Sequence, residues 1–291
     1  MNVAVLGAGT MGHGIAQVSA MAGHSVTLRD IEKDLVDAGI ASIRDNLEGG
    51  IERGKVTTAE RDETLDRIDG VTSLEAAVAE ADLVIEAIPE DMDLKQSTFT
   101  DVEAAAPADG IIASNTSSLS VTEIASALDR PGRAVGLHFF NPPHIMGLVE
   151  VILAEQTTHE TQDSAEAFVT GIGKTPITVE DSPGFATSRL GVALGAEAIR
   201  MLQTGVASAR DIDRAMALGY NHPMGPIELT DVVGLDVRLD VLEYLQRELG
   251  ERFRPPQLLR RKVRAGKLGR KTGEGFYLWS DGEIVDEGGM K

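Results

Sequence analysis

Residues 7–12 read Gly7-Ala8-Gly9-Thr10-Met11-Gly12 and directly follow the apolar run 3–6. That run has the length and β-branched content of a buried parallel strand, and apolar residues at helical spacing continue from Ile15. A strand, a Gly-x-Gly-x-x-Gly turn and a helix in this order form the dinucleotide-binding fingerprint. Its first glycine permits the turn, its second lets phosphates approach the backbone, and its third lets the helix pack closely on the strand.

The segment that follows completes the fingerprint. A turn at 23–25 leads into a second predicted strand, 26–30, whose last residue, Asp30, lies 21 residues beyond Gly9. A carboxylate at this distance accepts hydrogen bonds from ribose hydroxyls and repels a 2′-phosphate. We therefore expect NAD as the cofactor, although the neighbouring Arg29 could accommodate a 2′-phosphate. A glycine turn in an unrelated α/β protein is the alternative. The residues expected to bind the dinucleotide here are Gly7, Gly9, Thr10, Met11, Gly12 and Asp30.

The composition is typical of a soluble cytoplasmic enzyme. The 291 residues suffice for two domains, and the absence of cysteine excludes a disulfide framework, a thiolate metal site and a catalytic thiol. We expect no metal site. The first 28 residues lack the basic leading region of a signal peptide, and no apolar run is long enough to span a membrane.

The charge balance is strongly acidic. There are 46 acidic against 27 basic residues, which gives a formal net charge of −19. Such a surface argues against nucleic acid or an anionic membrane as a partner. It also favours a protein adapted to high salt, where screening removes self-repulsion, over a merely acidic mesophilic protein.

Strand-like and helix-like segments alternate through the first 180 residues. This alternation predicts a Rossmann-type α/β domain with a mainly parallel sheet and helices on both faces, and residues 31–67 form a helical excursion. The expected strands are 3–6, 26–30, 82–88, 110–115, 134–140, 148–153 and 176–179, and the expected helices begin near 10, 93, 120 and 161.

Asp181-Ser182-Pro183-Gly184 ends this alternation. Beyond it the periodicity is helical, with segments near 190–202, 212–218 and 237–249. We therefore expect two domains, 1–182 for the dinucleotide and 183–291 as an all-α domain. The glycine-rich tail after Trp279 is expected to be mobile.

Two residues in the second half of the sheet point to chemistry. His138 ends an apolar strand, at the edge of the sheet where α/β proteins bind ligands, and Glu150 interrupts another wholly apolar strand. A histidine oriented by a buried glutamate makes a general base. From spacing alone, a satisfied structural histidine is the commoner case, and the buried glutamate makes the two interpretations equal. Ser117, in the polar run 114–118, is a plausible substrate contact, whereas Ser118 or Ser120 suits an ordinary helix cap.

Several longer motifs resemble the L-3-hydroxyacyl-CoA dehydrogenase family. The His138-to-Pro143 block, Leu148-Val149-Glu150-Val151 and Pro223-Met224-Gly225-Pro226 carry this resemblance most specifically, and it covers the whole chain. It implies NAD-dependent oxidation of a 3-hydroxyacyl-CoA, with the helical domain forming a homodimer. The 3-hydroxybutyryl-CoA dehydrogenases are members of this family.

The resemblance also implies roles for individual residues. His138 would take the proton from the 3-hydroxyl, Glu150 would orient the imidazole, and Ser117 and Asn141 would hold the reacting oxygen. The additional cofactor contacts that the resemblance implies are Glu90, Lys95 and Asn115.

One position departs from the family. Where members carry Asn, this chain has Ser188, a shorter side chain, so the preferred acyl length stays open. Arg53 and Lys55 lie where members bring basic side chains to the substrate's nucleotide. The basic segment 260–271 either serves the substrate or forms a solvated helix face that pairs with acids.

Two other functions remain as alternatives. A β-hydroxyacid dehydrogenase acting on a free acid would need a catalytic lysine, for which Lys174 is the only candidate. A non-catalytic NAD-binding protein would have no use for a buried histidine–glutamate pair, because such a pair costs stability.

Overall fold

The computed structural model describes residues 1–288. The chain forms two compact units, Met1–Ser182 and a second that begins at Pro183, and each is described by itself.

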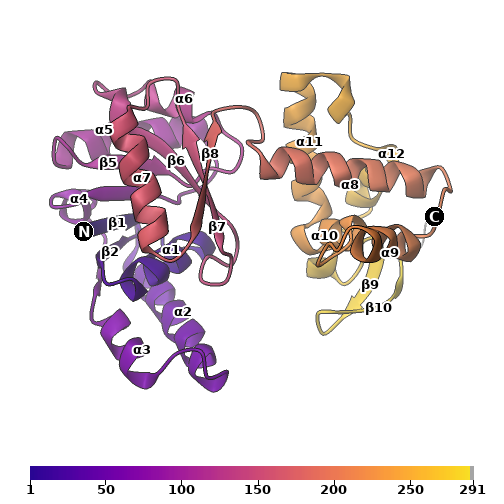
Figure 1. Ribbon diagram of the computed structural model, residues 1–291, viewed down its shortest axis with the longest axis horizontal. Coiled ribbons are helices and arrows are strands. Elements are labelled where there is room, and N and C mark those ends of the chain that lie inside the picture. The colour runs from indigo at the N-terminus through magenta and orange to yellow at the C-terminus, as the bar shows by residue number, and fades with distance from the viewer. Residues whose placement is uncertain (289–291) are drawn as a thin grey trace. The chain divides into compact units, whose positions relative to one another are not determined.

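An eight-stranded sheet forms the centre of the first unit (Figure 1). Its strands are β1 Asn2–Leu6, β2 Ser25–Arg29, β3 Ile68–Val71, β4 Leu83–Glu86, β5 Ile111–Ser114, β6 Ala134–Phe139, β7 Leu148–Leu153 and β8 Thr175–Glu180. They lie in the order β3-β2-β1-β4-β5-β6-β7-β8. Strands β1–β6 are parallel, β7 is antiparallel to β6, and β8 is parallel to β7. The mainly parallel sheet expected from the sequence is confirmed, whereas β3 was not anticipated.

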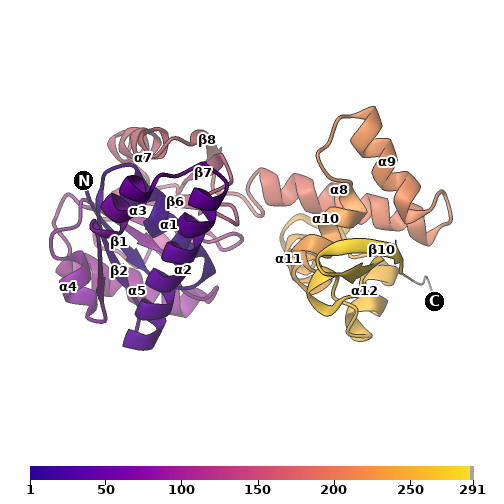
Figure 2. The ribbon, with the colours of Figure 1, turned by 90° about the horizontal axis from the view of Figure 1, so that it is seen from below.

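Helices cover both faces of this sheet (Figure 2). They are α1 Thr10–Met21, α2 Lys33–Glu52, α3 Thr58–Leu65, α4 Leu74–Val78, α5 Met92–Ala105, α6 Val121–Ala125 and α7 His159–Gly171, with a short 3₁₀ turn at Pro131–Arg133. The excursion expected at 31–67 is the pair α2 and α3, and a capping box at Thr57 starts α3.

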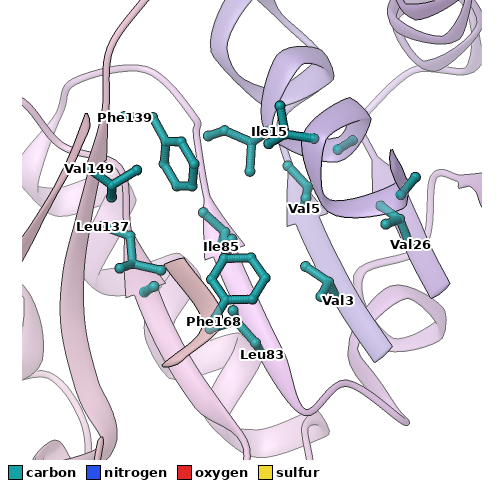
Figure 3. Close-up of a cluster of buried hydrophobic side chains, with 14 of the residues drawn as sticks. Val3, Val5, Ile15, Val26, Leu83, Ile85, Leu137, Phe139, Val149 and Phe168 are labelled. Atoms are coloured by element: carbon teal, nitrogen blue, oxygen red, sulfur yellow. The ribbon is translucent and has the colours of Figure 1, made fainter. Parts of the chain in front are cut away.

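Alternation along the strands assigns the helices to their faces. Val135 and Leu137 of β6 belong to a buried cluster that includes residues of α1, α2 and α7. Figure 3 shows this cluster, with Ile15 of α1 and Phe168 of α7 over Val3, Ile85 and Leu137. A Cβ at Gly136, between Val135 and Leu137, would instead lie 3.0 Å from Val121 of α6, which therefore packs on the other face.

The second unit is mainly helical. Its elements are α8 Thr187–Gln203, α9 Ala209–Gly219, α10 Pro226–Val233, α11 Leu235–Leu249, α12 Gln257–Arg264, 3₁₀ turns at Glu251–Phe253 and Arg270–Thr272, and the strands β9 Tyr277–Ser280 and β10 Glu283–Glu287. The three helices expected from periodicity are present as α8, α9 and α11. The expected mobile tail is wrong as far as Gly288, because β10 pairs antiparallel with β9, and residues 289–291 lie outside the described part of the chain.

A buried carboxylate anchors this hairpin. Asp231 of α10 is fully buried and accepts hydrogen bonds from the backbone N–H groups of Phe276 (2.8 Å) and Tyr277 (2.9 Å) and from the Trp279 indole (2.9 Å). The hairpin is thereby fixed to the helical core by three donors on one carboxylate.

The basic segment 260–271 is engaged within the same unit. Lys271 pairs with Asp236 at 2.6 Å, and Lys262 donates to the carbonyl of Gly275 at 2.7 Å. Arg260 also pairs with Glu243, and Lys267 pairs with Glu274. These partners favour the structural interpretation of the segment over a role in binding substrate.

Candidate active site

The glycine turn between β1 and α1 fits a bound pyrophosphate. Gly7 has a φ of +100°, and a Cβ at Gly12 would lie 1.7 Å from the carbonyl oxygen of Gly7, so neither position accepts another residue. A Cβ at Gly9 would meet nothing within 4 Å. The backbone at the N-terminus of α1 is therefore open to an approaching phosphate, and no acidic residue in the first helical turn opposes its charge.

Asp30, just beyond the end of β2, holds this turn. Its Oδ2 accepts the backbone N–H of Ala8 at 2.7 Å, and its Oδ1 accepts that of Ile31 at 2.7 Å. An ionised carboxylate accepts about four hydrogen bonds, so capacity for ribose hydroxyls remains. The neighbouring Arg29 donates through Nε to the carbonyl of Thr72 at 3.0 Å, an engagement that counts against its serving a 2′-phosphate.

His138 and Glu150 form a buried pair. They lie directly opposite each other on the antiparallel strands β6 and β7, which puts both side chains on the same face of the sheet. His138 Nδ1 lies 2.6 Å from Glu150 Oε2, the histidine is 7% exposed and the glutamate is fully buried. With Glu150 ionised, Nδ1–H donates to the carboxylate, which fixes the tautomer and the orientation of the ring.

A pocket of about 340 Å³ opens beside this pair. It brings together residues predicted for catalysis and for the cofactor at the carboxyl ends of β1, β4, β5 and β6. Its lining residues are Met11, Ala87, Ile88, Glu90, Asn115, Ser117, His138, Phe139, Phe140 and Asn141.

Asn115 joins two neighbouring strand ends of the pocket. Its Oδ1 accepts the backbone N–H of Phe139 at 2.9 Å, and its own N–H donates to the carbonyl of Glu86 at 2.8 Å. It therefore ties the residue after β5 to the strand that carries His138.

Glu90, next to the charge of Lys95, holds the serine-rich turn 116–118 at the pocket. Glu90 Oε1 accepts hydrogen bonds from Thr116 Oγ1 (2.6 Å) and from the backbone N–H groups of Ser117 (3.1 Å) and Ser118 (3.2 Å). Burial alone would raise the pKa of Glu90, but the Lys95 charge and these hydrogen bonds outweigh it and hold that pKa below its ordinary value. Glu90 thus fixes the turn that carries Ser117.

Lys95 is buried and lies outside the pocket lining. It is 1% exposed, and its Nζ donates to Glu86 Oε1 at 2.6 Å and lies 3.4 Å from Glu90 Oε2. Glu86, fully buried, also accepts from Ser114 Oγ at 2.6 Å and from the N–H of Ile88 at 2.8 Å. The resemblance implies that Lys95 contacts the cofactor. In the structure it contacts Glu86 and Glu90 instead and does not line the pocket.

Three other predicted residues are not among those that line this pocket. Arg53 and Lys55 are exposed after the end of α2 and do not line the pocket, and Ser188 is in the first turn of α8 in the second unit. Ser120 caps α6, as anticipated, by accepting the N–H of Glu123.

Sequence reasoning missed Glu86 and Phe140. Glu86 follows the apolar run Leu83–Ile85, the same signal that singled out Glu150. The Phe140 ring lies 4.6 Å from the His138 ring, and only the fold places it in the pocket wall.

Comparisons with known proteins agree with this arrangement. The NAD-binding domain of the 3-hydroxyacyl-CoA dehydrogenases matches residues 2–182, and the C-terminal domain of the same family matches residues 184–279. The chain is 44% identical over 280 residues to a probable 3-hydroxybutyryl-CoA dehydrogenase of Deinococcus radiodurans, covering 96% of this chain and all of that protein. It is 42% identical to a 3-hydroxybutyryl-CoA dehydrogenase of Clostridioides difficile, covering 95% and 99% of the two chains.

Solved structures have the same fold. The crystal structure of (S)-3-hydroxybutyryl-CoA dehydrogenase from Ralstonia eutropha superposes with a TM-score of 0.93 at 43% identity, covering 96% of this chain and 99% of that one. In the described part of the chain, no helix combines the length and the apolar character needed to cross a bilayer.

Proposed function

The chain belongs to the 3-hydroxyacyl-CoA dehydrogenase family, and we propose that it oxidises a short-chain (S)-3-hydroxyacyl-CoA, such as 3-hydroxybutyryl-CoA, reversibly to the 3-oxoacyl-CoA. The observation that carries the proposal is the buried His138–Glu150 pair at the wall of a pocket next to the glycine turn. An acid–base group beside a dinucleotide site is what removal of a proton and a hydride from one alcohol requires.

The two protein groups divide the proton chemistry. His138 accepts the proton of the 3-hydroxyl through Nε2, because Nδ1 is engaged by Glu150. Glu150 stabilises the imidazolium that forms, in the way a buried carboxylate does in other catalytic pairs. NAD, when bound, supplies the hydride acceptor. The N-terminus of α1 would hold its pyrophosphate, and Asp30 would hold its ribose.

Further residues position the substrate. Ser117 and Asn141 in the pocket wall hold the reacting oxygen, while Asn115 and Glu90 support the cofactor end. Ser188, Arg53 and Lys55 are proposed to contact the acyl-CoA, as the resemblance implies. Because Ser188 is shorter than the asparagine of the family, we expect it to change the acyl length that the enzyme prefers.

The setting is proposed to be the cytoplasm, with a homodimer formed through the helical unit. Large apolar side chains exposed on that unit support an interface, among them Leu190 (71% exposed), Leu218 (85%) and Tyr220 (75%).

The alternative functions are less well supported. A β-hydroxyacid dehydrogenase needs a catalytic lysine, but the Lys174 amine donates to two backbone carbonyls and does not line the pocket. A non-catalytic protein leaves the cost of burying His138 and Glu150 unexplained.

The test is a pair of substitutions assayed with 3-hydroxybutyryl-CoA and NAD. His138→Gln and Glu150→Gln should each lower kcat by roughly 10²–10⁴-fold, the usual effect of losing a positioned acid–base group. The dissociation constant of NADH should change little, and the control His159→Gln, at an exposed residue of α7, should behave as wild type. Wild-type kcat in either dyad variant would refute the mechanism. Comparison of C4, C6, C10 and C16 substrates then fixes the acyl length.

A further inference from the structure

The loop between β6 and β7, residues 140–147, carries Asn141 and connects the two strands that hold the dyad. Within the loop, the backbone N–H groups of Ile145 and Met146 both donate to the carbonyl of Pro142 at 3.0 Å. Ile145 and Met146 are exposed, at 68% and 39%, so little burial of their side chains holds this segment down. Its position depends on contacts made from outside the loop.

Lys174 makes the strongest of these contacts. It lies at the turn between α7 and β8, and its Nζ donates to the carbonyl oxygens of Pro143 and Met146, each at 2.6 Å. The side chain is half-buried, and this burial lowers the pKa of the amine. An ammonium group with two short bonds to carbonyls three residues apart joins both halves of the loop.

Two other contacts complete the placement of the loop. The N–H of Thr175, next to Lys174, donates to the carbonyl of Gly147 at 2.8 Å. In addition, a Cβ at Gly14 would lie 2.7 Å from Pro143 Cδ, so the proline packs directly on α1. The loop is therefore held by two separate contacts, one with the helix of the glycine turn and one with the Lys174 ammonium.

We propose that Lys174 is a positioning residue for catalysis: its ammonium fixes the 140–147 loop and thereby sets Asn141 relative to His138. The proposal rests on the proposed function, because it assigns to Asn141 a hold on the reacting oxygen. A displacement of about 1 Å at such a group costs roughly 10²-fold in rate. Cofactor binding through the glycine turn and Asp30 does not involve Lys174.

The absence of cysteine permits a precise test. Lys174→Cys removes the ammonium, and alkylation of this single thiol with 2-bromoethylamine restores an amine on a side chain of nearly the same length. We expect Lys174→Cys to lower kcat/KM for 3-hydroxybutyryl-CoA by about 10- to 100-fold, with the NADH dissociation constant within about twofold of wild type. Alkylation should return kcat/KM to within about threefold.

Lys33→Cys, in an exposed pair with Asp37 on α2, is the matched control and should be unaffected before and after alkylation. Wild-type kcat/KM in Lys174→Cys would overturn the proposal. So would a kcat/KM that does not recover after alkylation, once mass spectrometry has verified that the thiol is alkylated. A lysine that only stabilised the fold would lower Tm and spare kcat/KM well below the transition. Loss of activity in His138→Gln without loss in Lys174→Cys would reject this inference and leave the proposed function standing.

Discussion

At the scale of single residues, Asp30 combines two roles that a substitution can separate. Its carboxylate accepts the N–H of Ala8 and so braces the glycine turn, and its charge opposes a 2′-phosphate. We expect wild-type kcat/KM to favour NAD over NADP by about 100-fold, which corresponds to about 2.7 kcal/mol. Asp30→Asn keeps an acceptor for Ala8 and should lose most of this preference, while Asp30→Ala should also reduce kcat/KM with NAD.

The measurement is steady-state kinetics with both cofactors for the two variants and for Asp34→Asn, at an exposed acid in the first turn of α2, as the control. Equal kcat/KM of the wild-type protein for NAD and NADP would contradict this assignment.

Other residues of the site differ in how far sequence could predict them. Glu150 was detectable because a charged residue inside an apolar strand needs a partner, but its pairing with His138 depends on strand register. The buried position of Lys95 could not be derived, because a lysine in the first turns of a helix is ordinarily solvated. The resemblance implied a ligand contact there, whereas the fold pairs it with Glu86.

At the scale of elements, the Glu86–Lys95 ion pair joins the end of β4 to α5 under the pocket. Both side chains are 1% exposed, so removal of one partner leaves a buried charge uncompensated. We predict that Lys95→Met lowers the free energy of unfolding by about 3–5 kcal/mol in urea titrations. The double variant Glu86→Gln/Lys95→Met should lose less than this, because no charge is then left buried.

The control is Lys33→Met, since Lys33 and Asp37 form a pair that is 77% and 57% exposed and should contribute less than about 1 kcal/mol. If Lys95→Met lowered the free energy of unfolding by less than about 1 kcal/mol as well, the Glu86–Lys95 pair would be solvated rather than buried in solution.

Two element-level features carried signals in the sequence, one in a turn and one in the length of a connection. Asp281-Gly282 is a strong hairpin signal, and both residues have positive φ (52° and 82°), yet the glycines and acids around them suggested a mobile tail. Only eight residues, 140–147, connect β6 to β7, which is too short for a parallel crossover and therefore requires the antiparallel pairing observed. Strand β3 is only four residues long, with Asp69 and Gly70 at its centre, and offers almost no apolar pattern.

At the scale of the whole molecule, the alternation of strands and helices was sufficient to predict the Rossmann-type sheet, and helical periodicity was sufficient to predict the helical second unit. Periodicity predicts layers because it reports which face of each element is buried. Contacts between residues distant in the chain, such as Asp231 with the β9 segment, leave no such periodic trace.

The net charge of −19 also acts on the whole molecule, through repulsion among exposed acids. At 0.1 M salt, charges interact over about 10 Å, and at 1 M over about 3 Å, so added salt should relieve this repulsion in the folded state. We predict that Tm rises by at least about 5 °C between 0.1 and 3 M KCl. The variant Asp34→Asn/Asp45→Asn/Glu52→Gln removes three negative charges from exposed positions on α2 and should be less dependent on salt. A Tm that stays flat or falls over this range would identify an ordinary acidic protein rather than one adapted to high salt.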